Sequence, residues 1–257
     1  MIFLKTVEEI EQIKEGAMIL SKAHGLIAQK IRPGLATKVL DELVEVFIKD
    51  HHGKPSFKGY KGFPFTLCTS IGEHVVHGLP SDYELKEGDV VSVDCGVYYK
   101  GFHSDAAFTY PVGEQCQEVM DLLKTTKQAL YLGIDEVSTG KRIGDIGHTI
   151  QSYVEKYNYS VVRELGGHGI GRRLHEAPDI PNYGKRGRGR KIEEGMVLAI
   201  EPMINLGTKY VVQEENNGSF RTLDRKPSVH FEHTVAVVKG RAEILTTYKY
   251  IEEVFKF

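Results

Sequence analysis

The sequence contains no tryptophan and few cysteines, three among 257 residues. They are Cys68, Cys95 and Cys116, and none lies in a C-x-x-C spacing, so neither a disulfide framework nor a zinc ribbon is indicated. No apolar run approaches the roughly 18 residues that a membrane-spanning helix needs. A formal net charge of −2 also lacks the basic surplus typical of nucleic-acid-binding proteins. We therefore expect no DNA partner and no membrane partner.

The remaining composition is typical of a globular protein. Hydrophobic residues make up 41% and charged residues 26% of the chain, which is enough apolar material for a sizeable core. The first residues, MIFLKTVEEIEQIKEG, lack the basic-then-apolar order of a secretory signal, and unpaired cysteines suit a reducing compartment. We expect one large α/β unit that is cytoplasmic and monomeric.

Residues 92–110, SVDCGVYYKGFHSDAAFTY, predict two strands joined by a tight turn. A turn centred between Tyr99 and Lys100 pairs residues whose numbers sum to 199, which places Asp94 opposite Asp105 on one face of the sheet. Two carboxylates about 5 Å apart repel by on the order of 3 kcal/mol at an effective dielectric constant of about 20. Either one of them is protonated or a cation lies between them.

The chain contains an internal repeat. Two ten-residue segments share one pattern: an apolar residue, a charged pair, Gly and then a strand pattern that ends on an acid. They are LKEGDVVSVD, residues 85–94, and IEEGMVLAIE, residues 192–201. Their offset is 107 residues, which aligns Asp94 with Glu201. Upstream, IRPGLATKVLDEL and VSTGKRIGDIGHT match loosely at an offset of 106 residues, and each leads into an amphipathic helix. An earlier helix precedes each of these, one beginning at a capping box of Thr6 and Glu9 and the other covering residues 115–132.

These repeats predict the domain organisation. We expect a single catalytic domain, residues 1–257, built of two helix-helix-strand halves at approximately 6–110 and 115–240. A shared sheet would carry the helices on its outer side and leave an inner face for the acids. Chance similarity between amphipathic segments is the alternative.

Four acids lie inside apolar strand patterns: Asp94, Asp105, Glu201 and Glu232. Glu232, in VHFEHTVAVV, follows Asp105 by 127 residues. An insertion is therefore expected in the second half, and the polar stretch 213–227 is its natural place. Unpaired buried carboxylates are costly, and no Lys or Arg lies near them in these strands. Two divalent cations bridged by carboxylates would neutralise all four.

A histidine completes the candidate metal set. In ELGGHGIGRRLHEAPDIPNYG, His168 lies between glycines, which let the backbone approach a site closely. His175 follows seven residues later. A surface or structural role is the alternative for any single histidine, and the flanking glycines favour His168 as a ligand.

These candidate ligands resemble the dinuclear site of the methionine aminopeptidases in their order along the chain: Asp94, Asp105, His168, Glu201 and Glu232, with GGHGIG around the histidine. Five further segments resemble that family and occur in the same order: GYKGFP, TSIGEHVVHGLP, RRLHEAPDIPNYG, IEPMI and FEHTVAV. The resemblance implies the pita-bread fold, in which two pseudo-symmetric α/β (α+β) halves surround a curved, mainly antiparallel sheet. It points to a bacterial-style type I enzyme, because Glu201 and Glu232 are 31 residues apart and leave no room for the helical insert of type II enzymes.

The resemblance also implies how the metals are held. Asp94 would chelate one metal, Asp105 and Glu232 would bridge both, and His168 and Glu201 would complete the other. Four carboxylates and one imidazole suit Co(II), Mn(II), Fe(II) or Zn(II), and the ligands do not choose among them.

Catalytic roles follow from the same resemblance. Glu201 is the implied proton shuttle for a metal-bridged water that attacks the first peptide bond. His77 would hydrogen-bond the scissile amide, and His175 would stabilise the oxyanion. Loop packing is the alternative for both histidines.

The implied methionine pocket involves Tyr60, Phe63 and Cys68, although the two aromatics could equally be core residues. Leu174 and Gly218 stand where the family often has an aromatic residue and a pocket-rim Trp. These departures leave the shape of the pocket rim open.

The implied activity is removal of the initiator methionine from nascent proteins, preferentially when the second residue is small. The basic run KRGRGRK, residues 185–191, suggests a transient contact with ribosomal RNA, for which a solvated loop is the alternative. Three rival functions remain: an Xaa-Pro peptidase of the same fold, a non-catalytic binding module on this fold, and a di-metal phosphoesterase, which would need cationic groups converging on the metals.

Overall fold

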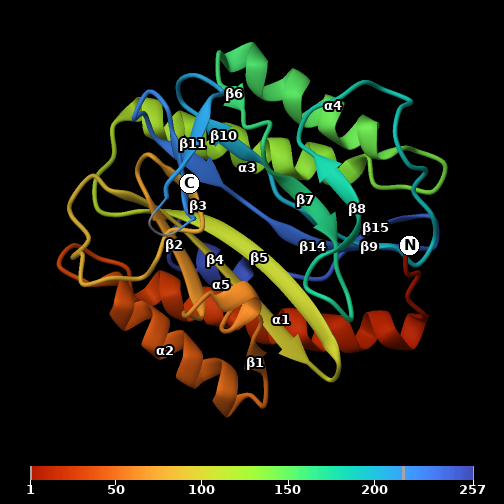
Figure 1. The fold of residues 1–257 in the computed structure, drawn as a ribbon, viewed down its shortest axis with the longest axis horizontal. Coiled ribbons are helices and arrows are strands. Elements are labelled where there is room, and N and C mark those ends of the chain that lie inside the picture. Colours follow the sequence, from red (N-terminus) through yellow and green to blue (C-terminus); the bar gives the residue numbers. More distant parts are fainter. Residues whose placement is uncertain (1, 216–217, 257) are drawn as a thin grey trace.

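Two helices begin the chain. A computed structural model describes residues 2–215 and 218–256, and its first elements are α1, Val7–Lys30, and α2, Thr37–Asp50 (Figure 1). The predicted capping box is confirmed, because the Thr6 hydroxyl accepts a hydrogen bond from the Glu9 N–H and the Glu9 carboxylate accepts one from the Thr6 N–H. The apolar face of α1 is buried, at Ile10, Ile13, Ala17 and Leu20 among others.

A long hairpin follows, made of β4, Val90–Tyr99, and β5, Phe102–Pro111. β4 also pairs with β1, Lys54–Pro55, and β2, Leu67–Ile71, so the first half forms a four-stranded antiparallel sheet. A short 3-10 helix, η1, occupies Tyr60–Gly62 between β1 and β2.

The second half repeats this order with α3, Gln117–Asp135, and α4, Ile143–Val154. A five-stranded antiparallel sheet follows, in the order β15 (Arg241–Ile244), β14 (His233–Val238), β9 (Val197–Ile200), β7 (Gly166–Gly169) and β8 (Glu176–Pro181). β9 ends just before Glu201 as predicted, whereas β4 continues past Asp94.

Two small sheets complete the fold. One contains β13 (Ser228–His230), β10 (Met203–Asn205) and β6 (Ser160–Val161), and the other contains β11 (Val211–Gln213), β12 (Phe220–Thr222) and β3 (His74–Val76). The short elements η2 and α5 cover Glu155–Tyr157 and Lys249–Glu252. The predicted insertion at residues 213–227 carries β12, and residues 216–217 of it lie outside the described part.

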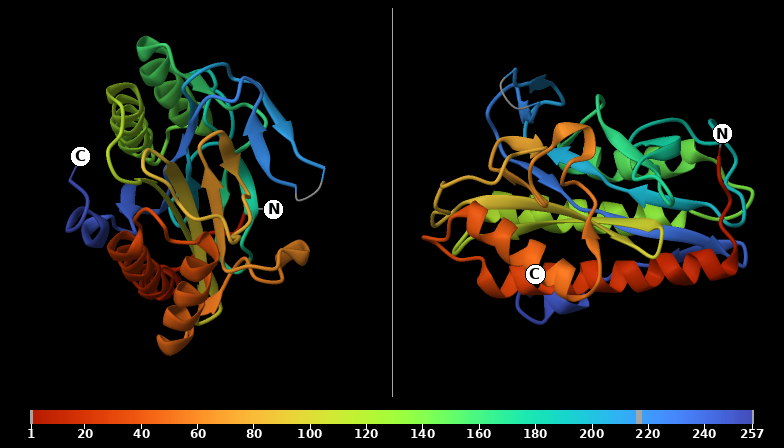
Figure 2. Two further views of the ribbon diagram at one scale, coloured as in Figure 1. Left: turned by 90° about the vertical axis from the view of Figure 1, so that its left-hand side faces the viewer. Right: turned by 60° about the horizontal axis from the view of Figure 1, so that its bottom comes forward.

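The two large sheets meet where β5 lies against the start of β14. The Thr234 hydroxyl donates to the Asp105 carbonyl (2.7 Å) and accepts from the Asp105 N–H (2.9 Å), and the Glu232 N–H donates to the Ala107 carbonyl (2.9 Å). The four long helices gather on one side of the sheets, and the β11–β12 hairpin projects on the other (Figure 2, left). No helix within the described residues is both long and apolar enough to cross a membrane.

The predicted opposition of Asp94 and Asp105 is wrong by two residues. Asp94 pairs with Ala107, and Asp105 pairs with Gly96. The turn consists of Lys100 and Gly101, whose φ angles of 47° and 93° meet the requirement of a type I′ hairpin for positive φ at both central residues. The shift is even, so both aspartates still lie on one face of the sheet, as diagonal rather than opposed neighbours.

Candidate metal centre

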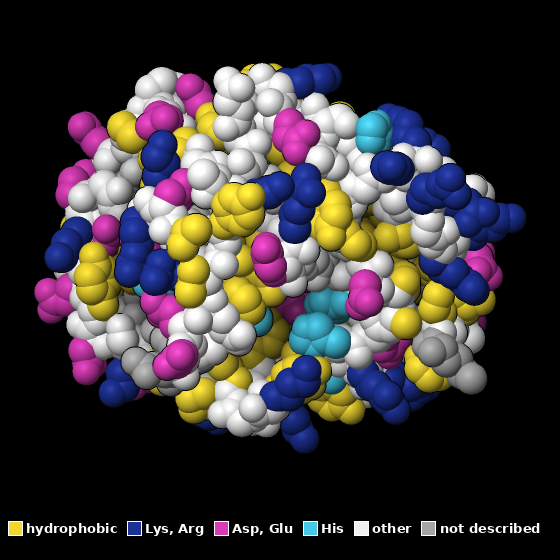
Figure 3. Space-filling model, turned by 45° about the horizontal axis from the view of Figure 1, so that its top comes forward, with side chains coloured by type: hydrophobic (Ala, Val, Ile, Leu, Met, Phe, Trp, Pro, Cys, Tyr) yellow, Lys and Arg dark blue, Asp and Glu magenta, His cyan; other side chains and the backbone are white. Residues whose placement is uncertain are grey.

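A cavity of about 670 Å³ is lined by residues of both large sheets and of the β11–β12 hairpin. All ten residues proposed from the sequence line it: Tyr60, Phe63, Cys68, His77, Asp94, Asp105, His168, His175, Glu201 and Glu232. Histidine side chains gather at this hollow beside hydrophobic ones (Figure 3). The structure thus brings together residues that are up to 172 positions apart in the sequence.

The two aspartates enter the cavity from neighbouring strands of the hairpin. Their carboxyl groups share a hydrogen bond. Burial raises the pKa of Asp94 to about 7, and burial together with the charge of Asp94 raises the pKa of Asp105 well above its ordinary value. Without a cation, the pair therefore retains a proton near neutral pH.

The two glutamates come from the second half of the chain. Burial raises the pKa of Glu201 to about 7 and raises that of Glu232 further, with Asp105 adding to the shift at Glu232. One carboxylate oxygen each of Asp94 and Glu232 is buried without a hydrogen-bond partner within residues 2–215 and 218–256. Such oxygens are costly unless a cation or proton satisfies them.

His168 is aimed at these acids by its neighbours. A Cβ on Gly167 would lie 2.2 Å from the Ala199 carbonyl oxygen, and one on Gly169 would lie 2.3 Å from that of Ala177, so the close backbone approach predicted from the glycines is confirmed. The Nδ1 of His168 lies 2.9 Å from the Gly169 carbonyl oxygen. Nδ1 is therefore the donor in the neutral ring, which leaves the Nε2 lone pair for a ligand.

The donor set fits divalent cations. Asp105, His168 and Glu232 each offer a ligand atom within 4.8 Å of the others, and Oε1 of Glu201 lies 3.6 Å from Nε2 of His168. Carboxylate oxygens with one imidazole form a hard, oxygen-rich set. Asp94 adjoins this group through its hydrogen bond to Asp105.

Two further histidines stand at the cavity mouth. The Nδ1 of His175 lies 3.1 Å from the Tyr60 hydroxyl, and the two rings stack with their centroids 5.3 Å apart. Burial and the adjacent His168 ring, at 4.2 Å, lower the pKa of His175. His77 has a left-handed backbone (φ 60°), and a Cβ on the following Gly78 would lie 2.2 Å from the Thr69 carbonyl oxygen. Close backbone contact thus holds the His77 loop in a sparsely populated conformation.

One end of the cavity is apolar. Tyr60, Phe63, Cys68 and Leu174 line it together with Phe57, and all five belong to one hydrophobic cluster. Burial raises the pKa of the Cys68 thiol, so this side chain is neutral and adds to the apolar wall.

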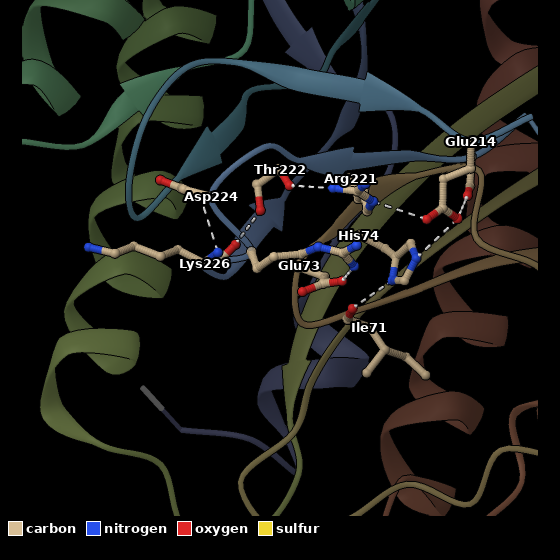
Figure 4. A network of polar contacts seen from close by, with 10 residues as sticks. Ile71, Glu73, His74, Glu214, Arg221, Thr222, Asp224 and Lys226 are labelled. Carbon is tan, nitrogen blue, oxygen red and sulfur yellow. Dashed lines mark hydrogen bonds and ion pairs between the residues drawn. The ribbon is translucent and has the colours of Figure 1, made fainter.

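The rim is built by the β11–β12 hairpin, whose Gln213 and Gly218 line the cavity. Glu214 accepts hydrogen bonds from the Arg221 Nε (3.2 Å) and the Ser219 hydroxyl (3.0 Å), and it lies 3.5 Å from the Nε2 of His74 (Figure 4). His74 belongs to β3, so this network attaches the hairpin to the body of the fold.

The sequence reasoning missed one residue of this site. His230, at the end of β13, is 1% exposed, and its Nε2 lies 3.4 Å from Oε2 of Glu201. A signal was present, because His230 and Glu232 are two residues apart in an extended segment and so share a face.

Residues 11–239 match the profile of metallopeptidase family M24. The chain belongs to this family. It is 47% identical over 249 residues to the methionine aminopeptidase of Clostridium perfringens, covering 97% of this chain and 100% of that one. It is 45% identical over 246 residues to methionine aminopeptidase 1 of Bacillus subtilis, covering 96% and 99%.

Solved structures agree with this assignment to family M24. The crystal structure of methionine aminopeptidase from Rickettsia prowazekii matches with a TM-score of 0.95 at 39% identity, covering 96% of this chain and 100% of that one. The predicted pita-bread fold is therefore confirmed. Membership of the M24 metallopeptidases makes the chain a hydrolase that uses divalent metal.

Proposed function

We propose that this M24 metallopeptidase removes the initiator methionine from nascent proteins, preferentially when the second residue is small. The observation that carries the proposal is the junction of two surfaces in one cavity. Five ligand-type side chains line it together with an apolar wall of Tyr60, Phe63, Cys68 and Leu174. The high identity to relatives named methionine aminopeptidase supports this substrate over an Xaa-Pro bond.

Five residues would hold two divalent cations: Asp94, Asp105, His168, Glu201 and Glu232. When bound, the cations supply a water nucleophile at neutral pH and polarise the scissile carbonyl. Binding requires ionised carboxylates, so cation uptake releases the protons that burial retains on this cluster. Co(II), Mn(II), Fe(II) and Zn(II) all suit the donors.

The surrounding residues orient the substrate and move protons. Glu201 would accept a proton from the attacking water and return it to the leaving amine. The Tyr60 hydroxyl, donating to Nδ1 of His175, would leave the opposite Nε2–H to stabilise the oxyanion. His77 would bind the scissile amide from the other side of the mouth. Tyr60, Phe63 and Cys68 would contact the methionine side chain, whose sulfur packs favourably against aromatic rings.

Other parts of the proposal concern organisation and partners. The chain would act as a cytoplasmic monomer, with residues 1–257 forming one catalytic domain of two repeats. The basic run 185–191 is exposed, and two of its arginines already pair with acids: Arg186 with Glu136 and Arg190 with Glu193. A contact with ribosomal RNA would therefore rest on the remaining charges, and reversing them should weaken ribosome binding in a salt-dependent manner.

The deciding experiment is release of free methionine from Met-Ala-Ser by chelator-stripped protein, with and without Mn(II) or Co(II). Ala-Ala-Ser and Ala-Pro-Ser serve as matched controls. Metal-dependent release from the Met peptide alone supports the proposal. Preferred cleavage of the Ala-Pro bond would favour the Xaa-Pro peptidase, and no cleavage with any metal would favour a binding module.

A further inference from the structure

The Glu201 carboxylate lies between two imidazoles. Its Oε1 is 3.6 Å from Nε2 of His168, and its Oε2 is 3.4 Å from Nε2 of His230. His230 is almost completely buried, and its Nε2 has no hydrogen-bond partner among the described residues. A buried, unpartnered ring nitrogen aimed at a carboxylate requires an explanation.

The two rings differ in which nitrogen can carry the proton. His168 donates from Nδ1 to the Gly169 carbonyl, so its Nε2 presents a lone pair. A lone pair on Nε2 of His230 would face the lone pairs of Oε2, which is repulsive, whereas an N–H there is attracted to it. The 3.4 Å separation is about 0.4 Å longer than an ordinary N–H···O bond, so the inferred bond requires the carboxylate to move toward the ring.

The backbones on both sides are fixed independently of this contact. The Thr109 hydroxyl accepts from the His230 N–H (2.9 Å) and donates to the His230 carbonyl (2.8 Å). The Glu201 carbonyl accepts from the Asn182 side-chain amide (2.9 Å). The contact between His230 and Glu201 therefore acts on the orientation of the carboxylate and not on the course of either strand.

We propose that His230 is a positioning residue of the metal centre: its Nε2–H holds Oε2 of Glu201 and so directs Oε1 toward the cavity and His168. The inference rests on the metal-binding role of Glu201 under the proposed function. A hydrogen bond that fixes a ligating carboxylate raises metal affinity, and loss of such a partner typically costs about 10- to 100-fold.

The test compares His230→Gln with His230→Leu in the full chain. A glutamine amide can place an N–H where Nε2 was, whereas leucine fills the space without a donor. Calorimetric titration of the chelator-stripped proteins with Mn(II) measures affinity, and the visible absorption of the Co(II)-loaded proteins reports ligand geometry. We expect the leucine variant to bind about 10- to 100-fold more weakly with an altered Co(II) spectrum, and the glutamine variant to stay within about threefold of wild type.

Two outcomes would overturn the inference alone: an unchanged affinity in His230→Leu, or an equal loss in both variants while wild type binds metal. Should the leucine variant fail to fold, His230→Asn replaces it, because its shorter amide reaches only the position of Nδ1. Absence of Mn(II) and Co(II) binding by wild type would overturn the proposed function and this inference with it.

Discussion

Removing the metal should make the stability of this protein fall as the pH rises from 7.5 to 8.5. The four cavity acids have folded-state pKa values above their ordinary values near 4. A group with a raised folded pKa binds protons more tightly in the folded chain. Its stabilising contribution is complete below the unfolded pKa and disappears as the pH rises through the folded pKa.

Buried histidines act in the opposite direction at lower pH. Burial lowers the pKa of His24 to about 4, of His103 to about 4 and of His233 to about 3. These rings stay neutral in the folded chain while the unfolded chain protonates them below about pH 6.5, so they reduce stability as the pH falls. The two effects oppose each other up to about pH 7.5, where the unfolded histidines have lost nearly all of their protons, and above that pH the acids dominate.

The magnitude follows from the number of retained protons. Each proton bound by the folded but not the unfolded chain lowers the free energy of unfolding by about 1.4 kcal/mol per pH unit. One retained proton shared within the cluster therefore predicts a loss of about 1.4 kcal/mol between pH 7.5 and 8.5. Mn(II) should stabilise the protein more at pH 8.5 than at pH 7.5, because its carboxylate ligands must be ionised.

Urea unfolding of the chelator-stripped chain at pH 7.5, 8 and 8.5, with and without Mn(II), measures this directly. Asp105→Asn is the matched control, since an amide cannot lose a proton and should flatten the pH dependence. A metal-free stability that is constant or rises between pH 7.5 and 8.5 would refute the reasoning.

Three further predictions concern single residues. Asp105→Asn should abolish turnover and lower metal occupancy, measured by peptide assay and elemental analysis; unchanged activity would remove the bridging role. Lys5→Met should lower the free energy of unfolding, measured in urea, by about 3–5 kcal/mol. The Lys5 ammonium lies 2.6 Å from the Glu176 carboxylate, both side chains are almost fully buried, and the substitution leaves Glu176 without its ion-pair partner. A loss below about 1 kcal/mol contradicts this, and adding Glu176→Gln to the Lys5→Met variant should recover part of the loss. Gly78→Ala should lower kcat, because the added Cβ would press on the Thr69 carbonyl beside the His77 loop. The activation free energy should change by more than the free energy of unfolding, and an unchanged kcat would show that the loop conformation is unimportant.

Much of this fold and site could be predicted from local patterns. The capping box of α1 and the two strands of the β4–β5 hairpin are each specified within one short segment, and both are confirmed. Five of the ten site residues follow from strand pattern, repeat and flanking glycines, and the other five come from the family resemblance; the structure collects all ten in one cavity. The hydrophobic period of a strand, the capping residues of a helix and the position of a glycine all depend on backbone geometry, which a short segment largely determines by itself.

Tertiary structure decided the relations between segments. The positive φ angles of Lys100 and Gly101 set the hairpin register, and a turn of that type is selected jointly by the two strands that it joins. The contact of Thr234 with Asp105 aligns the two sheets and so the acids of the two halves. Neither relation is visible in the periodicity of one strand.

His230 illustrates the same limit at the site. Its residue type and its spacing from Glu232 are plain in the sequence, but a buried histidine is usually structural. Only the folded chain places its Nε2 beside Glu201, because β13 and the end of β9 belong to different sheets that meet at the cavity. The sequence by itself therefore determined which chemical groups this protein carries, and the packing of its sheets decided which of them touch, since contacts between distant segments depend on three-dimensional distance and not on spacing along the chain.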